Sequence, residues 1–172
     1  GDIYSDDHVT LSGDGARFDA DTAYLGKNSQ TIDYNIVADH FGKKTESLIT
    51  VNGALTDSAK KVFRGTIDFK KGSADSVGSE NETVLMLGDD VVNKTVPLIL
   101  CAEENVEGTH GATIGELDAD TMFYFESRGI DRETAERIMA YAAVERLIHM
   151  AEDGGFAAVA EKAMEIKTDT EE

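Results

Sequence analysis

Residues 51–76 read VNGALTDSAKKVFRGTIDFKKGSADS, and this stretch decides which fold classes the chain can adopt. Its centre combines β-branched and aromatic side chains, which favour extended backbone. These side chains follow a partial alternation along Val62, Phe63, Thr66, Ile67 and Phe69. Turn-forming clusters bound the run, because NG precedes it and KKGSAD follows it. The stretch therefore predicts a short strand between two turns.

The same pattern continues on both sides of this stretch, from about His8 to Leu117. Short runs such as TAYLG, ETVLMLG and TVPLILCAE are separated by glycine-rich and polar clusters, and no segment with a helical period interrupts them. Strands in succession without crossover helices predict a sandwich, a barrel or a β-helix. Gly-Ala and Ser-Ala steps recur at a loose, coil-like spacing without a clean repeat. Periodicity alone therefore leaves the sandwich and the β-helix open.

After Leu117 the apolar period becomes helical. Capping residues and glycine stops predict three helices, at Asp118–Arg128, Asp131–Glu152 and Phe156–Ile166. We therefore expect a β-domain over residues 1–117 and a small α-helical region over residues 118–172.

The second predicted helix is apolar on two sides. A second stripe, Tyr141, Val144 and Ile148, stands apart from the first. Either this stripe packs against the β-domain, or it binds a partner protein.

Composition excludes several functions. The net charge of −18 disfavours binding to nucleic-acid backbones. No apolar run approaches the roughly 20 residues of a membrane span, and the acidic start does not resemble a signal peptide. The single cysteine fits a reducing compartment, so we expect a cytoplasmic protein. Phosphate-loop, zinc-protease and nucleophile-elbow motifs are all missing from the sequence.

His110 is the most informative candidate site residue. It stands among small residues in VEGTHGATIG, where the two halves of the chain meet. It is either a functional imidazole or a buried one that is hydrogen-bonded to the backbone. His40, at the end of a strand-like run, is expected to be a hydrogen-bonding surface residue. Cys101, in PLILCA, is either a ligand or a small buried hydrophobe.

One segment resembles a known family. HGATIGELDADTMFYFESRGIDRETA, residues 110–135, is similar to the C-terminal signature of SufB/SufD iron–sulfur cluster assembly scaffolds. The resemblance extends upstream through NGALTDSAKKVFRGTIDFKKGSADSVGSEN and includes Pro97. It implies a mainly β fold, with a right-handed parallel β-helix core followed by a helical region, and so favours the β-helix over the sandwich.

The resemblance also implies partners and sites. Family scaffolds pair through their β-helix cores and bind an ABC-type ATPase, a SufC-like subunit, through their C-terminal helices. We therefore expect a homodimer or a pair with a second scaffold subunit. Partner contacts are expected at Arg128, Gly129 and Ile130, together with the second stripe.

The chain is expected to be a scaffold and not itself an enzyme, and to handle an iron–sulfur cluster or iron transiently. The ligands implied by the resemblance are His110, Cys101 and Glu82, where Glu82 takes the place of a SufB-type cysteine. This donor set is poor in the thiolates that clusters prefer. Two alternatives stay open: a structural subunit of the same complex without cluster chemistry, and a β-helix carbohydrate-active enzyme.

Overall fold

The computed structural model describes residues 1–150, which form a parallel β-helix of about four turns followed by two helices. Each turn contributes two strands. The strands are β1 (Ile3–Leu11), β2 (Arg17–Gly26), β3 (Thr31–His40), β4 (Glu46–Leu55), β5 (Lys60–Phe69), β6 (Ser76–Met86), β7 (Val92–Cys101) and β8 (Val106–Glu116).

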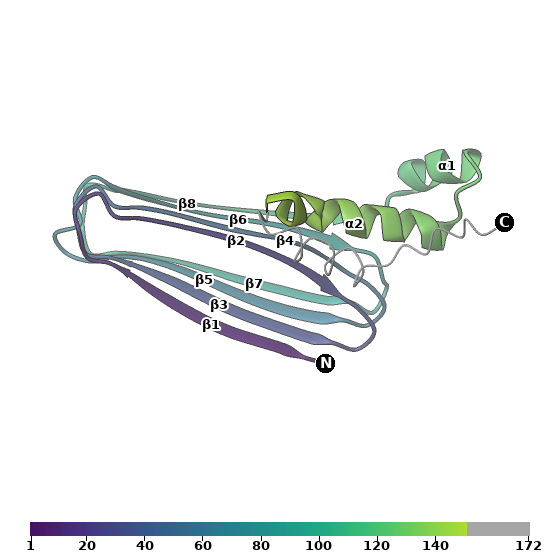
Figure 1. Cartoon of the computed structure of the whole chain (residues 1–172), viewed down its shortest axis with the longest axis horizontal. Helices are drawn as coiled ribbons and strands as arrows, with labels where there is room; N and C mark the ends of the chain where they lie inside the picture. The colour runs from purple at the N-terminus through teal and green to yellow at the C-terminus, as the bar shows by residue number, and fades with distance from the viewer. Residues whose placement is uncertain (151–172) are drawn as a thin grey trace.

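The strands stack in two facing sheets (Figure 1). One sheet has the order β1-β3-β5-β7 and the other the order β2-β4-β6-β8, and every pairing is parallel. Arg17 and Glu46 occupy the same place on neighbouring turns and are 29 residues apart. Consecutive strands such as β4 and β5 therefore lie in different sheets, so no hairpin joins them. This arrangement confirms the β-helix and excludes the sandwich.

The core lies between the two sheets. On β5, Phe63, Ile67 and Phe69 are fully buried, and on β4 Ile49 and Val51 meet them from the other side. Burying each such side chain stabilises the fold by about 1.5–3 kcal/mol. The inward positions of a strand alternate with outward ones. The partial alternation in the sequence arose because β-branched residues also occupy outward positions of β5.

Side-chain and backbone hydrogen bonds tie the corners of successive turns together. Asn28 and Asp57 both adopt a positive φ, of 55° and 56°, at equivalent corners. Asp57 accepts a hydrogen bond from the backbone N–H of Asn28 at 2.7 Å. Since such backbone conformations are costly for residues other than glycine, bonds of this kind between turns offset the strain.

The helices are α1 (Ala119–Ser127) and α2 (Arg132–Met150). Asp118 caps α1 by accepting the backbone N–H of Thr121 at 2.7 Å, and Asp131 caps α2 through Thr134 at 2.8 Å. These caps confirm the first two predicted helices. The third predicted helix and the last two residues of the second lie outside the described residues. Neither α1 nor α2 is both long and apolar enough to cross a membrane.

Helix α2 covers the outer face of the sheet that contains β2, β4 and β6 (Figure 1). Ala140, Val144 and Ile148 are buried along one side of the helix. Arg146 forms an ion pair with Asp21 of β2 at 2.5 Å. Val144 and Ile148 are therefore packed inside this chain, which corrects the expectation that the whole second stripe is free for a partner. Tyr141 stays half-buried.

Candidate functional site

The last turn of the β-helix is open on one side. Strand β7 pairs only with β5, and strand β8 only with β6. Both are therefore edge strands, whose outer N–H and C=O groups have no strand partner in residues 1–150. Strand β7 also exposes apolar side chains: Val96 is 52% exposed, Leu98 45% and Leu100 41%. The described part of the chain thus leaves both backbone and apolar surface uncovered at this end.

His110 lies on β8 and faces the interior side of the open turn. A side chain at Gly108 would contact Ile99 and Phe69 inside the helix, whereas one at Gly111 would contact Asn81 outside it. Since strand positions alternate, His110 lies on the same side as Gly108. It is nevertheless exposed, because the described part of the chain has no further turn above it. The alternative of a buried imidazole is therefore wrong.

Glu82 lies inside the third turn and is fully engaged. Its side chain is 1% exposed and forms an ion pair with Lys61, which is itself fully buried. Lys61 donates to one carboxylate oxygen and the hydroxyl of Thr95 donates to the other. Burial lowers the pKa of Lys61, and the nearby carboxylate of Glu80 opposes that shift. Both oxygens of Glu82 therefore already accept a hydrogen bond inside the core, from Lys61 and from Thr95.

Cys101 stands apart from His110. It is exposed at the end of β7, so the alternative of a small buried hydrophobe is wrong. In the third turn, Gly65 lies against the carboxyl group of Glu80. In the fourth turn, Pro97 occupies the position equivalent to Gly65, and His110 the position equivalent to Glu80, so Pro97 lies opposite His110. Cys101 follows Pro97 by four strand positions, a separation of about 13 Å at about 3.3 Å per residue. The structure therefore does not bring Cys101 and His110 together within one chain.

Glu80 is the neighbour of His110 that sequence reasoning missed. The two residues are Cα partners on β6 and β8. Glu80 is 2% exposed, and its Oε2 atom has no hydrogen-bond partner. Burial raises its pKa, while His110 and Lys61 act in the opposite direction. One turn of the β-helix takes about 30 residues, which is the separation of Glu80 and His110. A clear 30-residue repeat in the sequence would therefore have predicted that the two residues are neighbours.

The donors of one chain do not fit an iron–sulfur cluster. Protein clusters are held mainly by cysteine thiolates, and the single cysteine lies far from His110. Within residues 1–150, no group of three His, Cys, Asp or Glu side chains is arranged to hold a metal ion. His110 and the free oxygen of Glu80 are donors of the types that a single iron(II) ion accepts.

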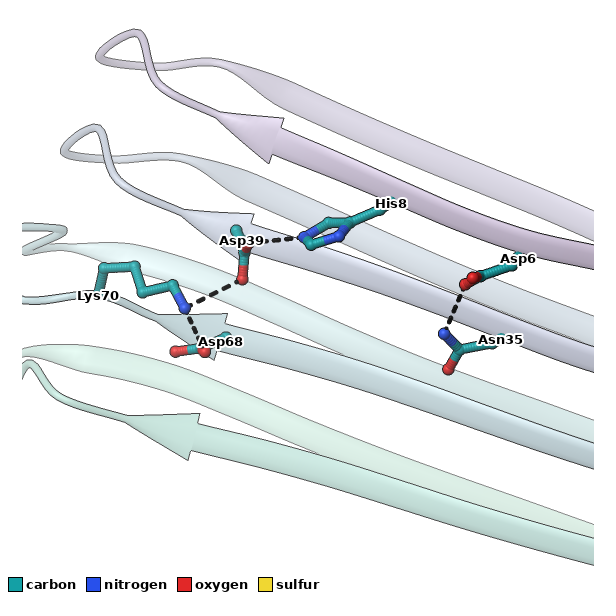
Figure 2. A network of polar contacts seen from close by, with 6 residues as sticks. All are labelled: Asp6, His8, Asn35, Asp39, Asp68 and Lys70. Carbon is teal, nitrogen blue, oxygen red and sulfur yellow. Dashed lines mark hydrogen bonds and ion pairs between the residues drawn. The ribbon is translucent and has the colours of Figure 1, made fainter.

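A second polar network covers the outer face of the odd-numbered sheet (Figure 2). Asp39 accepts hydrogen bonds from His8 at 2.7 Å and forms an ion pair with Lys70 at 3.3 Å. Lys70 also pairs with Asp68 at 2.5 Å. Each carboxylate drawn in this network is therefore already bonded to a neighbouring side chain. The network ties three turns together.

The helical region exposes aromatic side chains next to Arg128–Ile130, the segment expected to bind a partner. On α1, Phe123 is 72% exposed and Tyr124 53%. The guanidinium group of Arg128 lies 4.5 Å from the centre of the Tyr124 ring. Gly129, with a φ of 79°, then reverses the chain so that half-buried Ile130 leads into α2. These residues form one accessible surface of mixed aromatic and cationic character.

Comparison with known proteins identifies the family. Residues 1–143 match the family model described as "SUF system FeS cluster assembly, SufBD core domain". The chain is 33% identical to the iron–sulfur cluster assembly protein SufD of Bacillus subtilis over 141 residues, which are 82% of this chain and 32% of that protein. It is 29% identical to SufD of Escherichia coli over 101 residues, or 59% of this chain and 24% of that protein.

A plant protein is also similar to this chain. The iron–sulfur cluster assembly SufBD family protein ABCI8 of Arabidopsis thaliana, a chloroplastic protein, is 27% identical over 74% of this chain and 23% of its own length. The chain thus spans about a third or less of the curated relatives it matches. Because the family model covers most of the chain and the fold is the β-helix that the resemblance implied, this chain belongs to the SufBD family of iron–sulfur cluster assembly proteins.

Proposed function

We propose that this chain is a cytoplasmic scaffold subunit that pairs through its open β-helix end with a second scaffold chain, a copy of itself or a related subunit. The paired chains together provide the ligands for iron or a nascent cluster, and an ABC-type ATPase of the SufC kind binds the helical region. In this proposal residues 1–117 form the pairing unit and residues 118–172 the ATPase-binding unit. The chain itself catalyses no reaction.

The open last turn is the observation that carries this proposal. The edge strands of the two sheets, β7 and β8, offer backbone groups that have no strand partner within residues 1–150. The apolar side chains of Val96 and Leu98 on β7 and of Ile114 on β8 are about half exposed beside them. Pairing with a second β-helix would bury these groups and place two copies of His110 near each other. It would also add a second set of donors to a site that one chain leaves incomplete.

The exposed surface of α1 supports the ATPase contact. Phe123, Tyr124 and Arg128 are accessible together, and aromatic and arginine side chains are the commonest anchors of protein interfaces. Gly129 and Ile130 extend this surface toward α2, and the half-buried Tyr141 remains its candidate residue on that helix. Val144 and Ile148, being buried, would act only by supporting the position of α2.

Pairing is tested by light scattering after gel filtration. Leu98→Lys places a charge on the outer face of the β7 edge, and we expect it to convert a dimer into a monomer. Val77→Lys is the matched control, because Val77 is similarly exposed, at 43%, on the inner strand β6. A chain that stays monomeric alone and with a second scaffold subunit, or a Leu98→Lys variant that pairs normally, contradicts the proposed interface.

Cluster handling and ATPase binding are tested separately. Paired wild-type chains should acquire a cluster spectrum on anaerobic reconstitution with iron and sulfide, and His110→Ala should abolish it while pairing persists. Arg128→Glu should weaken capture of the ATPase subunit at least tenfold. Lys43→Glu, an exposed charge reversal at a corner of the β-helix, should leave that capture unchanged.

A structural subunit without cluster chemistry is the second candidate. The separation of Cys101 from His110 and the engagement of Glu82 by Lys61 and Thr95 favour it. This candidate predicts normal pairing and ATPase binding, with no cluster spectrum in any combination of subunits. The reconstitution experiment therefore separates the two functions.

A further inference from the structure

The side chains of Glu80 and His110 lie on adjacent turns and on the same face. Glu80 belongs to the last closed turn, and His110 belongs to the open turn directly above it. Neighbouring strands of a sheet lie about 4.8 Å apart. Because partners in a parallel pairing point to the same side, both side chains extend into the interior. The open end thus places an exposed imidazole over a buried carboxyl group.

The carboxyl group of Glu80 is accommodated by a missing side chain. Gly65 faces it from β5, and a methyl group at position 65 would overlap its carboxyl oxygens. The strand therefore leaves space for this carboxyl group inside an otherwise close-packed core. The Oε2 atom of Glu80 lies in this space and accepts no hydrogen bond, although buried polar atoms normally have a partner.

The buried charges of this region do not balance. Within residues 1–150, the fully buried ionisable side chains of the third turn are Lys61, Glu80 and Glu82. Lys61 is paired with Glu82, whose second oxygen is bonded by Thr95. Glu80 is consequently a surplus carboxylate, and an unpaired charge in such a place is strongly destabilising. It needs either a proton or a cation.

The open turn leaves the imidazole of His110 accessible to a cation, whereas the carboxylate of Glu80 beneath it is 2% exposed. His110 is exposed, so its imidazole is accessible from solvent while it stands above Glu80. Small neighbours on β8, Gly108 and Ala112, share the interior face with His110 and leave its ring unobstructed. Imidazole and carboxylate together are typical ligands of iron(II) and of similar divalent ions.

We propose that Glu80 and His110 are two ligands of a divalent-cation site of the iron(II) class at the open end of the β-helix. This inference rests on the scaffold function proposed above and names the acidic ligand of that site. Glu80 takes this role in place of Glu82, whose two oxygens already accept hydrogen bonds from Lys61 and Thr95. Two ligands from one chain leave most coordination positions open, as a site that must receive and release iron requires.

The test uses cobalt(II) as a spectroscopic probe for iron(II). The full 172-residue chain is titrated anaerobically in about 0.15 M salt with excess magnesium, which screens and occupies the acidic surface. The wild type should show one saturable set of cobalt absorption bands. Glu80→Gln and His110→Ala should each weaken this binding at least tenfold. Glu107→Gln, on the same strand as His110 but facing outward, should leave it unchanged.

Thermal unfolding supplies a second readout that does not depend on the spectrum. Without metal, Glu80→Gln should be at least as stable as the wild type, because the substitution removes a buried unpaired carboxylate. Cobalt should raise the melting temperature of the wild type and of Glu107→Gln, but not that of Glu80→Gln. Glu80→Met, which fills the same space without polar atoms, gives an independent variant if the glutamine variant folds poorly.

Two results would overturn the site. In the first, Glu80→Gln binds cobalt as tightly as the wild type, so that the carboxyl group is only a buried acid. In the second, Glu107→Gln loses as much binding, so that the cation sits on the acidic surface. Neither result affects pairing or ATPase capture, which report on the scaffold function separately. Conversely, loss of cobalt in Glu80→Gln combined with a chain that never pairs would reject the scaffold and keep the site.

Discussion

Replacement of Lys61 by methionine tests the buried ion pair of the third turn. Lys61 is fully buried and Glu82 is 1% exposed, so solvent does not screen the pair. The variant keeps an unbranched apolar side chain, one atom shorter, and removes the ammonium group with its charge and its hydrogen bonds. Glu82 then retains the hydroxyl of Thr95 and loses the one cation that pairs with it within residues 1–150.

The expected loss can be worked from the cost of protonation. A buried glutamate without a cation takes up a proton, although in water it holds one only below about pH 4.3. At pH 7 that uptake costs about 3.7 kcal/mol, at about 1.36 kcal/mol for each pH unit. This value agrees with the roughly 3–5 kcal/mol that breaking a buried pair costs in general. We therefore expect Lys61→Met to lower the free energy of unfolding by about 3–4 kcal/mol at pH 7.

The pH dependence identifies the cause. In the variant the folded state binds a proton that the unfolded state releases above about pH 4.3, so stability relative to the wild type rises as the pH falls. At pH 5.5 the deficit should shrink to about 1.6 kcal/mol. The double variant Lys61→Met/Glu82→Met should recover to within about 1 kcal/mol of the wild type, because an apolar pair of similar volume replaces the ion pair.

Urea unfolding followed by circular dichroism at both pH values measures these differences. Lys60→Met, a change at the exposed neighbour on the same strand, is the matched control and should cost less than about 0.5 kcal/mol. A loss of less than about 1 kcal/mol for Lys61→Met at pH 7 would contradict a stabilising ion pair. An equal loss at pH 5.5, or a double variant no more stable than the single one, would contradict it too.

Three further changes probe other parts of the fold. Burial lowers the pKa of His40, against the opposing effect of Asp39. The unfolded state therefore takes up a proton on this histidine first, and the free energy of unfolding falls as the pH drops below about 6.5. His40→Gln should flatten this pH profile in urea unfolding, and parallel profiles of variant and wild type would contradict the assignment. Burial alone would raise the pKa of Asp39, but the hydrogen bonds from His8 and Lys70 outweigh it and lower the pKa. Its contribution is therefore lost only as the pH falls below about 3.8, and at pH 7 Asp39→Asn should cost about 1 kcal/mol, with a smaller cost in high salt. Gly65→Ala should lower the melting temperature, because the added methyl group displaces the carboxyl group of Glu80. In the double variant, Glu80→Ala should relieve much of that loss. If the effects of the two substitutions on stability are strictly additive, the two positions do not contact each other.

The strands and helices could be predicted because their signals are local. Turn clusters, β-branched residues and capping aspartates mark element ends without reference to the rest of the chain, and Asp118 and Asp131 act as the caps that the sequence indicated. The sequence left the sandwich and the β-helix open, because both have similar strands. What separates them is the pairing of each strand with one about 30 residues away, and insertions at the corners obscure that repeat.

The buried polar residues could not be predicted, because their partners are distant in sequence. Lys61 meets Glu82, which is 21 residues away in the other sheet and therefore outside the repeat. His40 looked like a surface residue, yet it is fully buried between the hydroxyl groups of Thr45 and Ser47. The strand pattern shows only that alternate positions face inward. Whether a charged residue at such a position is stable depends on what the opposite sheet provides.

The distribution of buried charge along the β-helix connects the fold to its function. In the second turn, the interior holds the aliphatic side chains of Ile36, Ile49 and Val51, and at its end the hydrogen-bonded group of His40, Thr45 and Ser47. Within residues 1–150, the buried lysine and the buried carboxylates all belong to the third turn, next to the open fourth. Buried ion pairs are a poor way to stabilise a core, since apolar side chains of equal volume serve as well or better. Packing therefore does not explain why the buried charges gather in the third turn. Their place directly below the open fourth turn does explain it. A polar interior directly under the open turn places the one unpaired carboxylate, Glu80, within reach of His110 and of whatever enters from that end.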